Sequence, residues 1–223
     1  MVDAAIQTQP DRVAEESAPY DISLINFERL RQEFARSPAK RTATQNLRQV
    51  IERRLQRLLL QNPLRTDFQC HYEDIVAEYN REKDRVTIEK SFEAFLKLVQ
   101  ELDDEQRRAV REGLDEESLA IFDLLKKSEL TPAEIKRIKS VAVELLKVLK
   151  AEKLKVDHWR DKEATRDAVR LAIKDFLWSD ETGLPVDKYD EPEVQERAEE
   201  VYRHVYRVYP EIPSPFYAAG AVA

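Results

Sequence analysis

Apolar residues recur along most of the chain at intervals of three and four positions, which is the spacing of one face of an α-helix. The narrowest stripe begins after Thr87 and contains Ile88, Phe92, Phe95, Leu96, Val99 and Leu102. No segment of strand length alternates apolar and polar residues between turn signals, so we expect no sheet. The pattern predicts an all-α fold, an irregular bundle of about eight or nine helices.

Capping residues, proline and glycine mark the ends of these helices. Thr131 to Glu134 reads as a capping box with proline at the first helical position, while Asp67, Asp115 and Asp190 can each cap a helix. Gly113 suits the left-handed end of a short helical segment. The expected helices lie at about 27–37, 44–61, 67–79, 87–102, 103–111, 115–125, 131–149, 157–178 and 190–209.

One predicted helix, residues 157–178, has apolar side chains on two sides. Its main stripe contains Thr165, Val169, Ala172, Ile173, Phe176 and Leu177. Leu171 and Trp178 fall on nearly the opposite side, which predicts a helix sandwiched between neighbours. Three interpretations of this pair stay open: coverage by the last helix of the chain, an exposed anchor for a protein partner, and a tryptophan at a frayed helix end.

Length and composition set the domain organisation that we expect. A chain of 223 residues with 42% hydrophobic residues can bury a sizeable core, while 36% charged residues and three glycines favour long, solvated helices. We expect a disordered lead-in over residues 1–20, one helical domain over 21–210 with a candidate subdivision near 113, and a flexible tail over 211–223. No apolar run reaches membrane-spanning length, so we expect a cytoplasmic protein with no membrane association.

Motifs for catalysis, cofactors and metals do not emerge from the sequence. The glycines are isolated from one another, so neither a P-loop nor a dinucleotide-binding loop is indicated. The three histidines, His71, His158 and His204, form no ligand-spaced pair, and Cys70 is the single cysteine. We therefore predict no catalytic residue, no cofactor and no metal site.

Positive charge is concentrated between Glu28 and Arg65, where ten basic residues and three acidic ones give a net charge of +7 in a chain whose total is −7. Such a segment can form a surface that follows phosphates or an acidic partner. The candidate contacts are Arg29, Arg31, Lys40, Arg41, Arg48, Arg53 and Arg57. The alternative is that these helices pack against the acidic remainder, so that the charges cancel internally.

Arg54 differs from these arginines because it falls in the middle of an apolar stripe. An arginine in such a position usually packs its stem and pairs its guanidinium with a carboxylate of another helix. We therefore predict a structural role for Arg54.

Several ordered blocks of the chain resemble the C-terminal helical region of the restriction (R) subunit of type I restriction-modification enzymes. The first comprises Asn62-Pro63, Arg65, Asp67-Phe68, Tyr72, Ile75 and Tyr79-Asn80. The later blocks are GLDEESLAIFDLL (Gly113 to Leu125) and Trp159, Arg166, Val169-Arg170 and Ile173. The likeness runs from about Asp21 to Pro210, and within it we expect Trp159 to be structural.

In that family, nuclease and motor domains cleave and translocate DNA, and the helical C-terminal region docks the subunit onto the methyltransferase. This chain has no nuclease or motor sequence. The resemblance therefore implies a non-catalytic assembly module whose partner is the methyltransferase (M) subunit, with DNA contacted directly or through the complex. The alternative is a helical nucleic-acid-binding protein that uses the basic segment 28–65.

Overall fold

The computed structural model describes residues 27–81 and 84–217, which form helices without any strand, and this confirms the all-α prediction. The chain divides into two compact units between Ser37 and Pro38. A residue that precedes proline avoids helical dihedrals, which explains why a helix ends here. Gly113, the candidate for a subdivision, lies inside the second unit. The predicted lead-in, residues 1–20, falls outside the described residues.

In the first unit the described structure is α1 (Phe27–Arg36). The second unit contains α2 (Lys40–Gln61), α3 (Thr66–Arg81), α4 (Arg85–Gln106), α5 (Arg108–Glu112), α6 (Glu116–Leu125), α7 (Pro132–Val148), a π-helical segment (Leu149–Lys153), α8 (Glu163–Trp178) and α9 (Glu191–Val208). None of the helices in the described ranges is long and apolar enough to cross a membrane.

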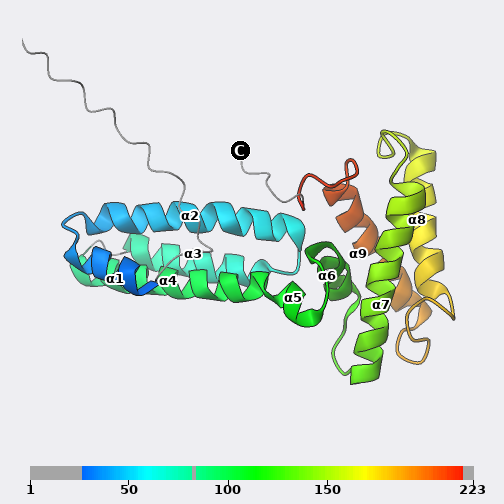
Figure 1. Cartoon of the computed structure of the whole chain (residues 1–223), viewed down its shortest axis with the longest axis horizontal. Coiled ribbons are helices and arrows are strands. Elements are labelled where there is room, and N and C mark those ends of the chain that lie inside the picture. The colour runs from blue at the N-terminus through cyan, green and yellow to red at the C-terminus, as the bar shows by residue number, and fades with distance from the viewer. Residues whose placement is uncertain (1–26, 82–83, 218–223) are drawn as a thin grey trace, which may run out of the picture. The chain divides into compact units, whose positions relative to one another are not determined.

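Within the second unit, α2, α3 and α4 run side by side, with α4 against both of the others (Figure 1). The predicted narrow stripe of α4 forms the core of this layer, and Phe95, Leu96 and Val99 are fully buried. The helix begins slightly before Thr87, because the Asp84 side chain accepts a hydrogen bond from the Thr87 amide at 2.7 Å.

A second layer is built around α6, which contacts α2, α5, α7 and α9. Nearly every residue from Ser118 to Leu125 is buried, as expected for a helix that is apolar all round. The sandwiched helix of this protein is therefore α6. The prediction that the helix ending at Trp178 is sandwiched is wrong, since α8 buries a single face and leaves Leu171 58% and Trp178 49% exposed.

The start of α8 also differs from the prediction. Residues 157–162 form turns, and α8 begins at Glu163. His158 takes a left-handed conformation with φ of 55°, which interrupts a helix, while Trp159 turns inward. The indole N–H of Trp159 donates to the main-chain carbonyl of Tyr209 at 2.8 Å. This tryptophan therefore anchors the turn before α8 to the end of α9.

Most of the predicted helix ends agree with the structure. The capping box at Thr131 is present, Asp115 caps α6, and Asp190 forms a second capping box at the start of α9. Gly113 ends α5 with φ of 70°, in the left-handed region. The segment predicted at 103–111 is corrected, because α4 continues to Gln106 and α5 is a single turn. Asp67 lies in the first turn of α3 and not before it.

Within the predicted tail, residues 214–217 pack onto the helices, whereas residues 211–213 are exposed. Ser214 is buried, and its hydroxyl donates to the carbonyl of Val208. The amide side chain of Gln61, at the end of α2, donates to the carbonyl of Phe216 at 2.8 Å, and the Tyr217 hydroxyl donates to the carbonyl of Gln61. These bonds connect the two layers of the second unit. Residues 218–223 lie outside the described residues.

Candidate functional site

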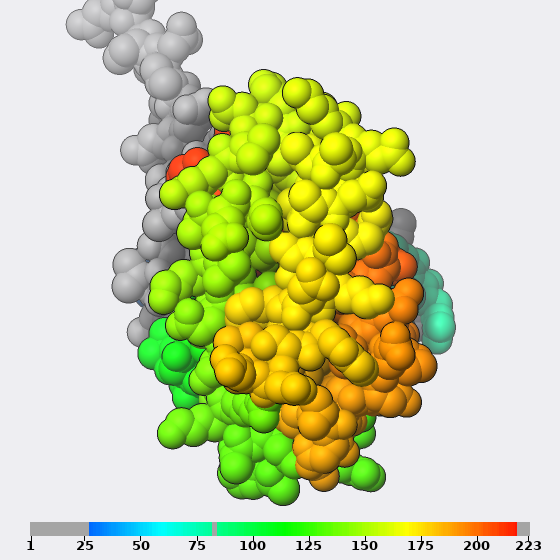
Figure 2. Space-filling view, turned by 90° about the vertical axis from the view of Figure 1, so that its right-hand side faces the viewer, coloured from blue at the N-terminus to red at the C-terminus, as the bar shows by residue number. Residues whose placement is uncertain are grey.

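The outer side of α8 presents an exposed stripe that we call the α8 stripe: Ala164, Ala168, Leu171, Asp175 and Trp178. Figure 2 looks onto a face of the second unit where α7, α8 and α9 lie next to one another. On this face α8 has a neighbour on each flank and its outer side is exposed. The opposite side of the helix buries Val169, Ile173 and Leu177 in the core, which fixes the orientation of the stripe.

The end of α8 is held by hydrogen bonds and does not fray. Gly183 donates its amide to the carbonyl of Ser179 at 2.8 Å, and Leu184 donates to the carbonyl of Leu177 at 3.0 Å. A Cβ on Gly183 would lie 2.4 Å from the Leu177 carbonyl oxygen, so only glycine fits this turn. The Arg137 side chain of α7 donates to the carbonyls of Gly183 and Asp180. Trp178 therefore lies at a helix end whose following turn is fixed by hydrogen bonds.

The basic residues expected to contact a phosphate backbone do not all face solvent freely. Arg29 and Arg31 lie on α1, where they pair with Glu33 and Glu28. Both ion pairs join side chains three or four positions apart on the surface of α1. Ion pairs between exposed side chains at this spacing contribute little to stability.

The other five candidates lie on α2. Lys40 pairs with Glu89 of α4, and Arg48 pairs with Glu52 while donating to the Tyr72 hydroxyl at 3.0 Å. Arg41 is exposed. Arg53 and Arg57 are also exposed, lie four residues apart on one side of α2, and pair with no carboxylate in the described ranges. Arg53 and Arg57 therefore form an exposed pair of positive charges on α2.

Arg54 points inward between α2 and α4. Its guanidinium pairs with Asp103 and donates to the side-chain carbonyl of Gln106 at 2.6 Å. The Arg54 side chain is 9% exposed, and that of Asp103 is 15% exposed. The contact therefore joins two helices through a largely buried ion pair.

The structure contains a second network of buried charges, which the sequence did not predict. Arg65, whose side chain is only 2% exposed, lies 2.9 Å from both Glu105 and Glu116. Arg108 contacts Glu105 and Asp123, and Asn62 donates to Asp123 at 2.6 Å. Asn62, Arg65, Glu116 and Asp123 all lie in the blocks that carry the family resemblance.

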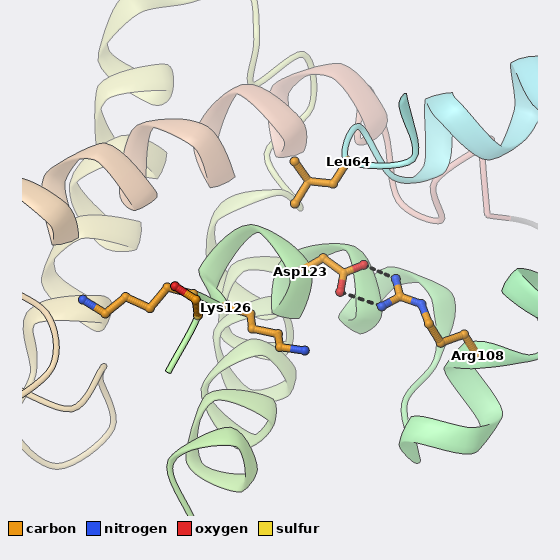
Figure 3. A pocket seen from close by; sticks show the side chains of 6 residues that line it. Leu64, Arg108, Asp123 and Lys126 are labelled. Carbon is orange, nitrogen blue, oxygen red and sulfur yellow. Dashed lines mark hydrogen bonds and ion pairs between the residues drawn. The ribbon is translucent and has the colours of Figure 1, made fainter. Parts of the chain in front are cut away.

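This network ties the turn after α2 to α4, α5 and α6. Figure 3 shows Arg108 and Asp123 at the edge of a hollow that Leu64 and Lys126 also line. Each carboxylate of the network pairs with at least one cation. The network therefore joins α4, α5 and α6 to the turn after α2.

The remaining titratable side chains of the described residues include the three histidines and the residue types that bind metals. No group of three or more His, Cys, Asp or Glu side chains is placed there to hold a metal ion. His204 is buried, and burial together with the nearby Arg207 lowers its pKa to about 3. His71 lies beside Glu101 and His158 beside Asp161, both at partly or fully exposed positions.

One protein family matches this chain over most of its length. A family model described as type I restriction enzyme HindI endonuclease subunit-like, C-terminal, matches residues 12–204. No curated protein and no solved structure matches the chain. The matched range includes α1 to α8 and most of α9, and therefore both the α8 stripe and the buried Arg65 network.

Proposed function

The chain belongs to the family of type I restriction enzyme HindI endonuclease subunit-like C-terminal domains, and from this premise we propose that it is a non-catalytic assembly module. It docks onto the methyltransferase and specificity part of a type I restriction-modification complex in the cytoplasm, with the methyltransferase (M) subunit as its direct partner. The observation that carries this proposal is the α8 stripe.

The spacing of the stripe suits another helix. Its five residues follow one another at intervals of four and three, so they form one line along α8. Ala164 and Ala168 leave little side chain between the helix and a neighbour, which permits close approach. Leu171 and Trp178 supply apolar area, and a tryptophan at an interface is a frequent hot spot. A helix of the partner can therefore lie along the stripe with Trp178 as its anchor.

Trp178→Ala tests this proposal. We expect its affinity for a purified methyltransferase–specificity complex to fall by about thirtyfold or more, the loss typical of a hot spot, with an unchanged melting temperature. Ala168→Glu should weaken binding as well, because it places a charge and extra volume in the line of contact. Val110→Ala, which truncates an apolar side chain that is 81% exposed on α5, is the matched control. Calorimetric titration with all three variants measures the effect, and wild-type affinity in both stripe variants would refute the proposal.

A second candidate function is nucleic-acid binding through α2, and the exposed, unpaired Arg53 and Arg57 favour it. Two guanidiniums on one side of a helix can contact two neighbouring phosphates. No aromatic side chain lies between them in the sequence to stack an unpaired base. Phosphate contacts of this kind position a protein on DNA without reading its sequence.

A further inference from the structure

We propose that the hollow between α8 and α9 binds single-stranded nucleic acid, with a base stacked at Tyr206 and phosphates held by the arginines around it. The hollow is lined by Arg166 of α8 and by Tyr202, Arg203 and Tyr206 of α9. It is independent of the α8 stripe, since it lies on the side of α8 that contacts α9.

The tyrosines form an aromatic floor with one accessible ring. Tyr202 is buried and Tyr206 is 40% exposed, and their ring centres are 6.1 Å apart. The buried Trp159 supports Tyr206 by an edge-on contact at 5.8 Å. An aromatic ring that is held in place by its neighbours and partly exposed can serve as a platform on which any base stacks.

Two guanidiniums lie over these rings. The Arg170 guanidinium is 4.2 Å from the Tyr202 ring centre, and that of Arg160 is 5.5 Å from the Tyr206 ring centre. A planar guanidinium over an aromatic ring extends the stacking surface and adds positive charge to it. The same combination of arginine and aromatic side chains is what single-strand-binding surfaces use.

The charge of the hollow is only partly neutralised. Arg166 donates to the carbonyl of Arg160 at 2.7 Å, and Arg160 donates to the carbonyl of Tyr206 at 3.1 Å. Carbonyls fix the direction of these guanidiniums without cancelling their charge, and neither arginine pairs with a carboxylate in the part of the chain described. Arg170 and Arg203 share Glu199, and Arg170 also pairs with Asp167. Four arginines thus face two carboxylates, so the hollow attracts anions although the chain as a whole is acidic.

The combination favours a single strand over other polyanions. An acidic peptide would use the arginines but has no planar group for Tyr206. Duplex DNA keeps its bases stacked inside the helix, so it offers the ring only its backbone. A single strand presents phosphates and unstacked bases together, which matches both features of the hollow.

The test uses fluorescence anisotropy of a labelled oligothymidine of about 15 nucleotides, the upper end of single-strand site sizes, at low salt with the full chain. Tyr206→Leu should weaken binding by about tenfold or more, whereas Tyr206→Phe, which keeps the ring, should bind as wild type. Arg166→Gln combined with Arg203→Gln should reduce the slope of log affinity against log salt by about 1.4, the value for two lost phosphate contacts with a single strand.

The matched control is Lys90→Gln combined with Lys97→Gln, which removes the same charge from exposed positions on α4 and should leave oligothymidine affinity unchanged. Melting temperatures of all variants report folding, and if Tyr206→Leu is unstable, Arg203→Gln alone serves, because that side chain is 72% exposed. No oligothymidine binding at low salt would overturn the proposal. The proposal would also be overturned if polyglutamate or duplex DNA bound as tightly as oligothymidine and if Tyr206→Leu left that binding unchanged. Binding of the methyltransferase complex is measured separately with Trp178→Ala. The oligothymidine proposal and the assembly proposal can therefore be refuted independently of each other.

Discussion

Tyr217 donates its hydroxyl proton to the main-chain carbonyl of Gln61, and the same hydroxyl oxygen lies 3.1 Å from Nε2 of His204. Because the tyrosine proton is already committed to Gln61, the His204 ring must donate Nε2–H to Tyr217. Burial raises the pKa of Tyr217, so its hydroxyl stays protonated. His204 is therefore held neutral, with Nδ1 buried and without a hydrogen-bond partner among the described residues.

This arrangement predicts a dependence of stability on pH. Unfolding restores the ordinary His204 pKa of 6.5, whereas in the folded protein the pKa is about 3. Between these values the unfolded chain binds a proton that the folded chain excludes, so the free energy of unfolding should fall by about 1.4 kcal/mol for each pH unit below 6.5. The full contribution is present above pH 6.5.

Urea denaturation at about pH 7, 6 and 5 measures the effect, a range in which ordinary carboxylates stay ionised. His204→Gln, which keeps a side-chain N–H for Tyr217, should flatten the dependence. The matched control is His158→Gln, because His158 is exposed. An equal slope in wild type and His204→Gln would show that His204 does not carry the dependence.

The Arg54–Asp103 pair predicts a large cost for removing one partner. Arg54→Ala leaves the Asp103 carboxylate largely buried without its cation, which should lower the free energy of unfolding by about 3 kcal/mol. Replacing both residues with leucine should cost much less, because no charge then remains in the contact. Chemical denaturation of Arg54→Leu, Asp103→Leu and the double leucine variant completes a double-mutant cycle, with Arg54→Ala measured alongside. A denaturation midpoint for Arg54→Ala that equals wild type would contradict this role.

The one-sided packing of α8 predicts unequal effects along the helix. Ile173 is fully buried, so Ile173→Ala should cost about 2–5 kcal/mol through lost burial and the cavity left behind. Phe176 is only partly buried at the edge of the core. Phe176→Ala should therefore lower the free energy of unfolding by less than the same replacement of a fully buried phenylalanine. Leu171→Ala on the exposed side is the control and should stay within about 0.5 kcal/mol of wild type. Thermal denaturation ranks the three, and a Leu171 effect as large as that of Ile173 would mean that both sides of α8 are core.

The exposed pair on α2 predicts a specific salt dependence with duplex DNA. If Arg53 and Arg57 each contact a phosphate, reversing both to glutamate should abolish most duplex binding, whereas Arg53→Gln with Arg57→Gln should lower the slope of log affinity against log salt by about 1.8. Anisotropy with a labelled duplex across a salt series measures both. Reversal that leaves duplex affinity intact, or wild-type protein that binds no duplex even at low salt, would exclude α2 as a nucleic-acid surface.

The sequence by itself determined the all-α class, most helix ends and the family. These are local properties: the Thr131 capping box and the glycine after α5 act within a few residues, and their side chains dictate backbone conformation directly. The apolar stripe of α4 is also local, since its spacing alone defines which face is buried. The family resemblance depends on short ordered blocks, and a match over residues 12–204 confirms it.

Only the tertiary structure decided which surfaces are covered. Periodicity shows that Leu171 and Trp178 share a side of α8, but coverage depends on whether another helix lies there, and the central position belongs to α6. Likewise, Tyr217 reaches Gln61 across 156 positions, and Arg166 and Tyr206 line one hollow because α8 packs on α9. Contacts of this kind arise from the way whole helices pack, and no local signal in the chain specifies them.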